Sequence, residues 1–345
     1  MNRLTALVDY AVALALLLTV TAYSTAGGTD YGAGIWDLLA GRFRRADKVR
    51  ALIDHAMAPV WEANNVWLVF AAVLTWSGFP LLFESVFRSV YPLFALALLG
   101  LILRGAFFAF RKAATTSATK LAATRVFGIS SLLAPFSFAA VLGAIASGKV
   151  GAVSPVVPVW RACLDPAAIA FGVVALAATA FSGASFLVGD ARRFRDPEVG
   201  GADLADYFRR RGIIAAIALL VLAAAALAVI GVDSPLVFRG MTAGFGLPFA
   251  ILAVVATVVV AVLLWRRLYL WYRTLTVVAV GSFVFAWGLG QAPYMLPGRL
   301  TIEQAAGAPA IQALLLGITV VALVLVLPSL LLLYMLDQRS ELQSP

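Results

Sequence analysis

The distribution of apolar and polar positions divides the chain into nine long apolar stretches joined by short polar segments. Runs of about 20 apolar residues are typical of helices that cross a bilayer. The second and third runs are separated only by a Gly-x-Pro sequence at Gly78 and Pro80, which suits a tight helical hairpin. The nine predicted helices cover residues 5–27, 51–77, 80–110, 122–147, 163–188, 212–231, 244–265, 272–291 and 309–336.

Composition identifies the broad class of protein. Hydrophobic residues fill 63% of the 345 positions and charged residues only 12%, whereas soluble domains carry about 25% charged residues. A soluble chain of this size could not bury so much apolar surface, so we predict an all-α, polytopic membrane protein. The first apolar run lacks a strongly basic lead-in and is expected to be a retained membrane anchor rather than a cleaved signal peptide.

The lysines and arginines provide a test of the helix count. Of the 26, 19 fall in or beside segments that would share one face of the membrane, five lie on the other face, and two lie inside the third helix. Basic residues are enriched in cytoplasmic loops, so the positive charge requires no nucleic-acid partner and places the N-terminus outside and the C-terminus in the cytoplasm. The five outer cations are Arg3, Lys149, Arg161, Arg239 and Arg299.

The longest polar stretch, residues 190–211, is expected to be a cytoplasmic connector. It divides a single membrane unit into an N-terminal half, residues 1–189 with helices one to five, and a C-terminal half, residues 190–345 with helices six to nine. Residues 21–24 (Thr-Ala-Tyr-Ser) resemble residues 179–182 (Thr-Ala-Phe-Ser). Duplication of a four-helix unit or chance would produce this similarity.

The second predicted helix carries a carboxylic acid, two carboxamides and two indoles within seven residues. Glu62 follows Arg50 by 12 residues, a rise of about 18 Å along a helix. A charge at the bilayer centre costs roughly 2.5–3.5 kcal/mol on insertion scales, which makes such a residue a candidate functional site. Glu62 either relays protons or is a neutral structural acid bonded to Asn64, Asn65 or a neighbouring helix. The segment reads Trp61-Glu62-Ala63-Asn64-Asn65-Val66-Trp67, and its two tryptophans could simply pack between helices.

Asp30 lies in a glycine-rich run, residues 27–34, at the expected cytoplasmic end of the first helix. Glycines permit close backbone approach or turns with positive φ. No Gly-Lys-Ser/Thr sequence follows the run and no strand is expected before it, so a phosphate-binding loop is excluded. Asp30 is either a point of proton uptake or a cap for the segment that continues towards Trp36. Arg104, on the third helix, either pairs with a carboxylate such as Asp30 or extends to the lipid headgroups.

The remaining titratable residues offer little redox or metal chemistry. Cys163 is the only cysteine and His55 the only histidine, so an intrachain disulfide is impossible and ligands for haem or transition metals are scarce. Glu84 and Arg88 are four residues apart, the spacing of an ordinary helix-surface ion pair. The chain alone is therefore expected to bind no haem and no metal.

Four motifs resemble subunit II of the cytochrome bd-type quinol oxidases. An Asp-x-Gly-x-Gly run in that family is similar to residues 30–34, and its signature Trp-Asp/Glu-x-Asn-x-Val-Trp, preceded by Ala-Pro, is similar to residues 58–67. A Phe-rich stretch around an arginine is similar to residues 103–108, and a late aromatic-proline motif to residues 291–297. The second-helix motif is the most specific of the four.

The resemblance implies a fold of two four-helix bundles plus one extra helix, in a bacterial cytoplasmic membrane. It implies a homologous subunit I that carries haems b and d and the quinol site, while subunit II carries none. Subunit II would stabilise its partner among the membrane lipids, hold a structural quinone in some members, and contribute to proton delivery from the cytoplasm. Asp30 and Glu62 would then form an inward half-channel, while the complex oxidises quinol and reduces dioxygen to water.

A secondary transporter is the alternative, because internal repeats and mid-membrane acids are also typical of transporters. That alternative predicts substrate uptake by the isolated chain in liposomes. The oxidase-subunit interpretation predicts that the purified chain has no haem absorbance alone and co-purifies with a haem-rich partner.

Overall fold

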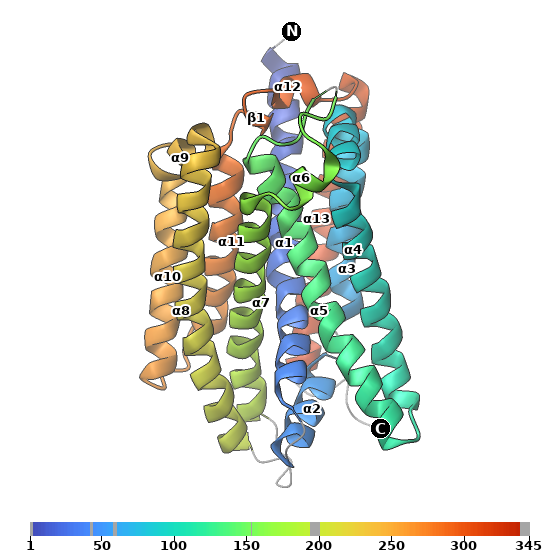
Figure 1. Cartoon of the computed structure of the whole chain (residues 1–345), viewed down its shortest axis with the longest axis vertical. Coiled ribbons are helices and arrows are strands. Elements are labelled where there is room, and N and C mark those ends of the chain that lie inside the picture. The colour runs from blue at the N-terminus through green and yellow to red at the C-terminus, as the bar shows by residue number, and fades with distance from the viewer. Residues whose placement is uncertain (1–2, 42–43, 58–60, 153, 194–200, 339–345) are drawn as a thin grey trace.

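The computed structural model describes residues 3–41, 44–57, 61–152, 154–193 and 201–338, which form a bundle of long helices with short elements at its two ends (Figure 1). Amphipathic α2 lies at one end, and α6, α9, α12 and the β-hairpin lie at the other. The elements are α1 (Arg3–Leu39), α2 (Arg44–Met57), α3 (Trp61–Val73), η1 (Leu74–Gly78), α4 (Pro80–Ala113), α5 (Ser117–Ala146), α6 (Val159–Cys163), α7 (Pro166–Arg193), α8 (Gly201–Asp233), α9 (Pro235–Thr242), α10 (Leu247–Trp265), α11 (Tyr272–Gly290), β1 (Tyr294–Leu296), β2 (Leu300–Thr301), α12 (Ile302–Ala305) and α13 (Pro309–Gln338).

Among the described residues, eight helices are long and apolar enough to cross a membrane: α1, α4, α5, α7, α8, α10, α11 and α13. Each coincides with one of the apolar runs in the sequence, so the prediction of a mostly helical, multi-span chain is confirmed. The helix limits predicted on either side of residues 190–211 are too narrow, because α7 continues to Arg193 and the described part of α8 already begins at Gly201. Helices extend past an apolar run wherever polar residues still favour helical backbone, since a hydropathy window reports transfer into lipid and not helix length.

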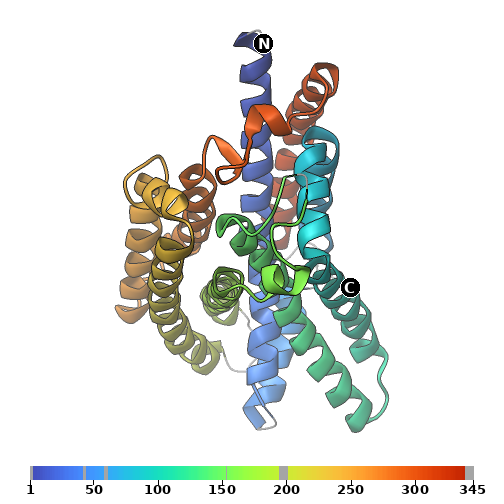
Figure 2. The same ribbon diagram turned by 45° about the horizontal axis from the view of Figure 1, so that its top comes forward.

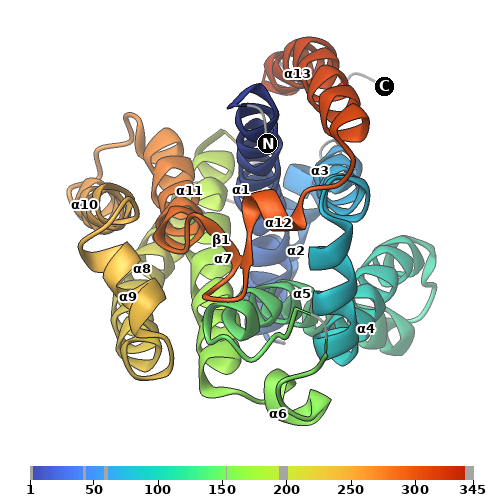
Figure 3. The ribbon, with the colours of Figure 1, turned by 90° about the horizontal axis from the view of Figure 1, so that it is seen from above.

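Helices α1 and α7 lie at the centre of the bundle. Helix α7 packs against α8 and α11, and α10 packs against α8 and α11, so these four helices form one group. Helix α1 packs against α3 and α5, and α4 packs against α5 on the other side of the molecule. Figures 2 and 3 show this division, with α8, α10 and α11 in yellow to orange on one side and α3, α4 and α5 on the other. Helix α13 lies beside α1 and η1.

The helix expected over residues 51–77 is described in parts. The structure has two helices there, α2 and α3, followed by a single π-helical segment, η1. Residues 58–60, between α2 and α3, lie outside the described residues. Position 62 belongs to α3, and its inferred rise of about 18 Å from Arg50 stays a prediction, because the residues that join α2 to α3 are not described.

The expected end of the first helix near residue 27 is also wrong. Helix α1 continues without a break to Leu39, so Asp30 and the glycine-rich run lie inside a helix. The described glycines with positive φ are Gly41, Gly148 and Gly298, and none of them belongs to this run. The run instead permits close helix packing. A Cβ placed on Gly32 would lie only 2.0 Å from the carbonyl oxygen of Thr179 on α7.

We expect Gly32→Ala to destabilise the protein by about 1–3 kcal/mol, because the added methyl group must push α1 away from α7. Gly28→Ala is the matched control on the same helix. Its Cβ would meet only a Thr179 methyl group at an ordinary 3.7 Å, and alanine is the better helix former. Thermal unfolding of the purified variants measures both effects. Equal melting temperatures for the two variants would contradict the close α1–α7 contact.

The segment after α11 is more ordered than the sequence suggested. Helix α11 ends at Gly290, as the prolines that follow it predicted, and strands β1 and β2 then pair as a short antiparallel hairpin. The hairpin leads into α12, where Thr301 and Gln304 form a capping box. The side chain of Gln312, at the start of α13, donates to the Gly78 carbonyl at 2.5 Å and so fixes this end of α13 against η1.

Candidate functional site

Asp30 of α1 and Asn64 of α3 form a direct pair between two neighbouring helices. The Asn64 amide nitrogen donates to Asp30 Oδ2 at 2.5 Å and to the Ala26 carbonyl at 3.3 Å. Asn64 is buried, and Asp30 is partly buried. The carbonyl of Ala26 lies one turn before Asp30, so Asn64 fixes α3 along this part of α1. A carboxylate of the glycine-rich run thereby meets a carboxamide of the segment 61–67.

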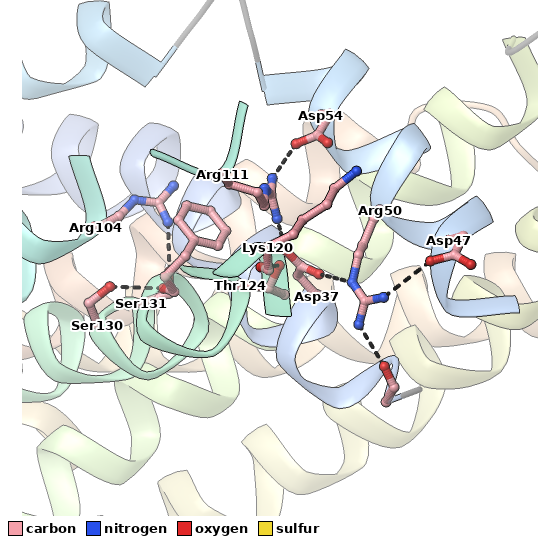
Figure 4. A network of polar contacts seen from close by, with 12 residues as sticks. Asp37, Asp47, Arg50, Asp54, Arg104, Arg111, Lys120, Thr124, Ser130 and Ser131 are labelled. Carbon is pink, nitrogen blue, oxygen red and sulfur yellow. Dashed lines mark hydrogen bonds and ion pairs between the residues drawn. The ribbon is translucent and has the colours of Figure 1, made fainter. Parts of the chain in front are cut away.

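Arg104 of α4 is buried beside this pair and does not extend to a headgroup region. Its Nη1 donates to the Ser131 hydroxyl of α5 at 2.8 Å (Figure 4). Its guanidinium carbon lies 4.8 Å from the ring centre of Tyr31 and 5.0 Å from that of Phe127. These contacts are cation–π interactions with two aromatic faces. The other terminal nitrogen, Nη2, is buried without a hydrogen-bond partner among the described residues.

A cavity of about 30 Å³ joins these groups. Its wall includes Asp30, Asn64, Asn65 and Arg104, together with Tyr23. No ion pair within 4.0 Å links Arg104 to Asp30 in the described part of the chain, so of the two alternatives for Arg104 a direct pair with Asp30 is not formed, and the two side chains share a polar cavity instead. A space of this size is large enough for a water molecule, and a water there would have several polar partners. Such a water could connect the Asp30 carboxyl to the free nitrogen of Arg104.

Two tyrosines close one side of the cavity. The hydroxyls of Tyr23 and Tyr31 lie 2.7 Å apart, and either can be the donor. The two rings meet edge to face with centres 6.4 Å apart. A hydroxyl pair can donate and accept at once, so it extends the hydrogen-bonding groups of the cavity by one turn or more along α1. Sequence inspection missed both tyrosines, although Tyr31 follows Asp30 directly.

The structure describes only some of the other predicted site residues. Asn65 lines the cavity. Trp67 is half-buried on α3. The side chains of Trp61 and Glu62 lie outside the described residues, so the proposed relay role of Glu62 stays a prediction.

A second polar cluster lies at the end of the bundle where α2 is located, and sequence inspection missed it. Asp37 of α1 is fully buried and accepts from Arg111 of α4 and, at 3.2 Å, from Arg50 of α2 (Figure 4). Arg111 also donates to Asp54, and Arg50 donates to the Gly41 carbonyl at 2.6 Å. The cluster therefore ties α1, α2 and α4 together.

The two clusters lie on the same helix. Asp37 follows Asp30 by seven residues, or roughly two helical turns and about 10 Å. Both positions therefore lie on a similar face of α1, one next to the small cavity and the other near the end of α4. Within the described ranges, no group of three or more His, Cys, Asp or Glu side chains is arranged to hold a metal ion. The chemistry of this region is thus that of carboxyl, guanidinium, carboxamide and phenol groups.

The family model for cytochrome bd terminal oxidase subunit II matches residues 8–337. The chain belongs to this family. The match includes α1, α3 and α4, the helices that carry the Asp30 site.

Named relatives agree with the family. Cytochrome bd ubiquinol oxidase subunit 2 of Bacillus subtilis (strain 168) is 33% identical over 85 residues, which cover 24% of each chain. Cytochrome bd-I ubiquinol oxidase subunit 2 of Escherichia coli (strain K12) is 28% identical over 89 residues, which cover 26% of this chain and 23% of the relative. These matches therefore span about a quarter of the length of the curated relatives.

The fold is shared along almost the whole chain. A chain of the bd oxidase structure from Geobacillus thermodenitrificans superposes with a TM-score of 0.79. The superposition covers 96% of this chain and 98% of the other, at 12% sequence identity. At that identity the likeness establishes the architecture alone.

Proposed function

We propose that this chain is the haem-free subunit II of a bacterial cytochrome bd-type quinol oxidase. Its partner, subunit I, would carry haems b and d, and the complex would oxidise quinol and reduce dioxygen to water. Subunit II would stabilise subunit I and help to deliver protons from the cytoplasm. The observation that best supports a role in proton delivery is the cavity between Asp30, Asn64 and Arg104 in a membrane-spanning bundle.

The donor set of the chain fits a haem-free subunit. Axial haem ligands are most often His, Cys or Met side chains, and this chain has a single histidine and a single cysteine. His55 is exposed on α2, whereas Cys163 is buried in α6 at the other end of the bundle. The two residues therefore cannot act as ligands of one common centre.

The proposed proton route begins at the cytoplasmic end of α1. Ionisable groups inside a membrane are typical of proton relays. Asp37 and its arginines would attract and organise polar groups there, and Asp30 would be the next acid along α1. Helical spacing places position 62 on the same face of α3 as the cavity-lining Asn65. We propose Glu62 as the acid that follows Asp30.

We also propose nine membrane crossings, with the N-terminus outside and the C-terminus in the cytoplasm. Residues 61–78, in α3 and η1, run without a break between α2 and the turn before α4. Eighteen helical residues would extend about 27 Å, close to the thickness of a bilayer core. This segment would be the ninth crossing. The sequence halves 1–189 and 190–345 would remain parts of one membrane unit.

An aromatic ladder on η1 and α4 is the surface we propose for docking of subunit I. We define the ladder as Trp76, Phe83, Phe87 and Phe94, with successive ring centres 5.5, 4.3 and 4.2 Å apart. Glu84 and Arg88 form the predicted ion pair on the same helix, with side chains 59% and 51% exposed. A partner chain would cover these rings and remove the ion pair from lipid.

Spectra of the isolated chain and of the complex test the proposal. We expect no haem absorbance in a reduced-minus-oxidised spectrum of the chain alone, and clear haem bands when it co-purifies with subunit I. Haem retained by the isolated chain would refute the haem-free assignment. Substrate uptake by the isolated chain in liposomes would instead support the transporter alternative.

Glu62→Gln is expected to lower the oxygen-consuming turnover of the complex several-fold while haem content stays the same, because glutamine keeps the shape but cannot carry a proton. Oxygen consumption with excess quinol, normalised to haem, measures the effect. Unchanged turnover would reject the relay role. Loss of the assembled complex would instead favour a structural acid.

A further inference from the structure

A cavity of about 440 Å³ opens at the end of the bundle opposite α2, beside the short helix α6. Its wall includes Lys149, after the end of α5, and Asp165, just before α7. Trp160, Arg161 and Leu164 of the α6 region also line it. Figure 3 shows α6 at the periphery of the bundle, where lipids would meet the protein. The volume lies within the range of small-molecule binding sites, about 300–1,000 Å³.

The charged side chains of the cavity carry a net positive charge. Lys149 Nζ lies 3.8 Å from Asp165 Oδ2, and the Asp165 side chain is only 5% exposed. The other oxygen of Asp165 accepts from the Ala167 backbone N–H at 3.0 Å, at the start of α7. Arg161 is exposed and forms no ion pair with any other described residue. The three side chains together carry a net charge of +1, and the negative one is already engaged by partners of its own.

Lysines and arginines are rare at this end of the bundle. Only five of the 26 lysines and arginines belong to this side, because positively charged residues favour the cytoplasmic side. Two of those five, Lys149 and Arg161, line the same cavity. Their convergence indicates an anionic ligand, since an exposed arginine has a planar fork of donors that matches phosphate oxygens.

The rim of the cavity is apolar. Trp160 is 66% exposed and Leu164 is 67% exposed, and both belong to the cavity wall. Tryptophan is enriched where the hydrocarbon core meets the headgroups. A ligand here would therefore place an anionic group against Lys149 and Arg161 and an apolar group along Trp160 and Leu164.

We propose that this cavity binds the phosphodiester headgroup of an anionic phospholipid of the phosphatidylglycerol type, in the leaflet at this end of the bundle. Arg161 holds one phosphate oxygen pair, Lys149 adds the second positive charge, and the acyl chains begin along Trp160 and Leu164. This site lies at the opposite end of the molecule from the Asp37 cluster and takes no part in the proposed proton route.

Native mass spectrometry of the purified complex, titrated with phosphatidylglycerol or phosphatidylcholine, tests the proposal. We expect tighter retention of phosphatidylglycerol, and about tenfold weaker retention in the double variant Lys149→Gln/Arg161→Gln. The control double variant Arg239→Gln/Arg299→Gln removes two cations from the same end of the bundle but outside this cavity. It should bind phosphatidylglycerol like the wild type. Equal affinity for the two lipids, or equal loss in both double variants, would overturn the proposal.

Two further measurements distinguish lipid binding from binding of free phosphate, and test the site without relying on a variant that could misfold. Inorganic phosphate at millimolar concentration should not displace the lipid, and full displacement would assign the cavity to free phosphate. In the wild-type complex, a photoreactive phosphatidylglycerol should crosslink to residues 157–164, and absence of crosslinks there would refute the site even if the double variant fails to assemble. Neither measurement depends on oxidase turnover, so their outcome is separate from that of the proposed function.

Discussion

Asp30→Asn will lower the oxygen-consuming turnover of the assembled complex by about tenfold or more, with haem content unchanged. Asparagine has nearly the same shape as aspartate and can still accept the hydrogen bond from Asn64. It cannot carry a proton or a negative charge opposite the free nitrogen of Arg104. Loss of a positioned proton-transfer group typically lowers a rate by 10²–10⁴-fold. We expect a smaller effect of about tenfold, because water in the cavity could carry protons past the substituted residue.

Oxygen consumption per haem, measured with saturating quinol, gives the turnover of this variant. Asp30→Glu should retain a substantial part of the activity, because it keeps a titratable carboxyl in the cavity. Asp206→Asn is the control, since it removes an acid from α8 that pairs with Arg209 and Arg267 and is not part of the cavity wall. Normal turnover of Asp30→Asn would exclude Asp30 from the route. Failure of the variant to hold subunit I would assign Asp30 a structural role.

Hydropathy predicted the helices that contact lipid and mispredicted where they end. Helix α4 begins at Pro80 and α11 ends at Gly290, and both positions are close to the predicted limits. At each of these two places an apolar run of the sequence ends at a proline or a polar turn. Helix α1 was expected to end near residue 27 but continues to Leu39. Its last turns are held by packing of the glycine run against α7, which no single-segment property reports.

The sequence predicted which residues belong to the candidate site, but it did not predict how these residues contact one another. The sequence singled out Asp30, Asn64 and Arg104, and the structure brings all three to one cavity. The Asp30–Asn64 hydrogen bond depends on how α3 is placed along α1, and residue spacing within one helix does not report that placement.

The Asp37 cluster was missed for a different reason. Counting cations by side of the membrane treats Arg50 and Arg111 as solvated loop residues. Both instead belong to helices and point at the same buried carboxylate, Asp37. A signal was present in the sequence, because Asp47 and Asp54 accompany Arg50 in an amphipathic segment, and acids have no part in the positive-inside rule.

This cluster supports the second prediction, that Arg111→Met will destabilise the protein by about 3–5 kcal/mol and sharply reduce the yield of the complex. The Arg111 side chain is 2% exposed and that of Asp37 is fully buried, so the variant leaves a buried carboxylate with Arg50 as its remaining ionic partner. Removing one member of a buried ion pair is costly mainly because the other charge stays desolvated. Asp54, 38% exposed, can be solvated by water instead.

A double variant separates this explanation from a loss of packing. Asp37→Asn/Arg111→Met removes the stranded charge together with its partner, so it should be more stable than Arg111→Met alone, and the coupling should exceed 1 kcal/mol. Arg210→Met is the control, because Arg210 is 74% exposed and lies 3.8 Å from Asp206, a surface pair that contributes about 0–1 kcal/mol. Thermal unfolding of the purified complexes provides the comparison. If the double variant is no more stable than Arg111→Met, the arginine stabilises the helices by filling space, and the ionic contact with Asp37 is secondary.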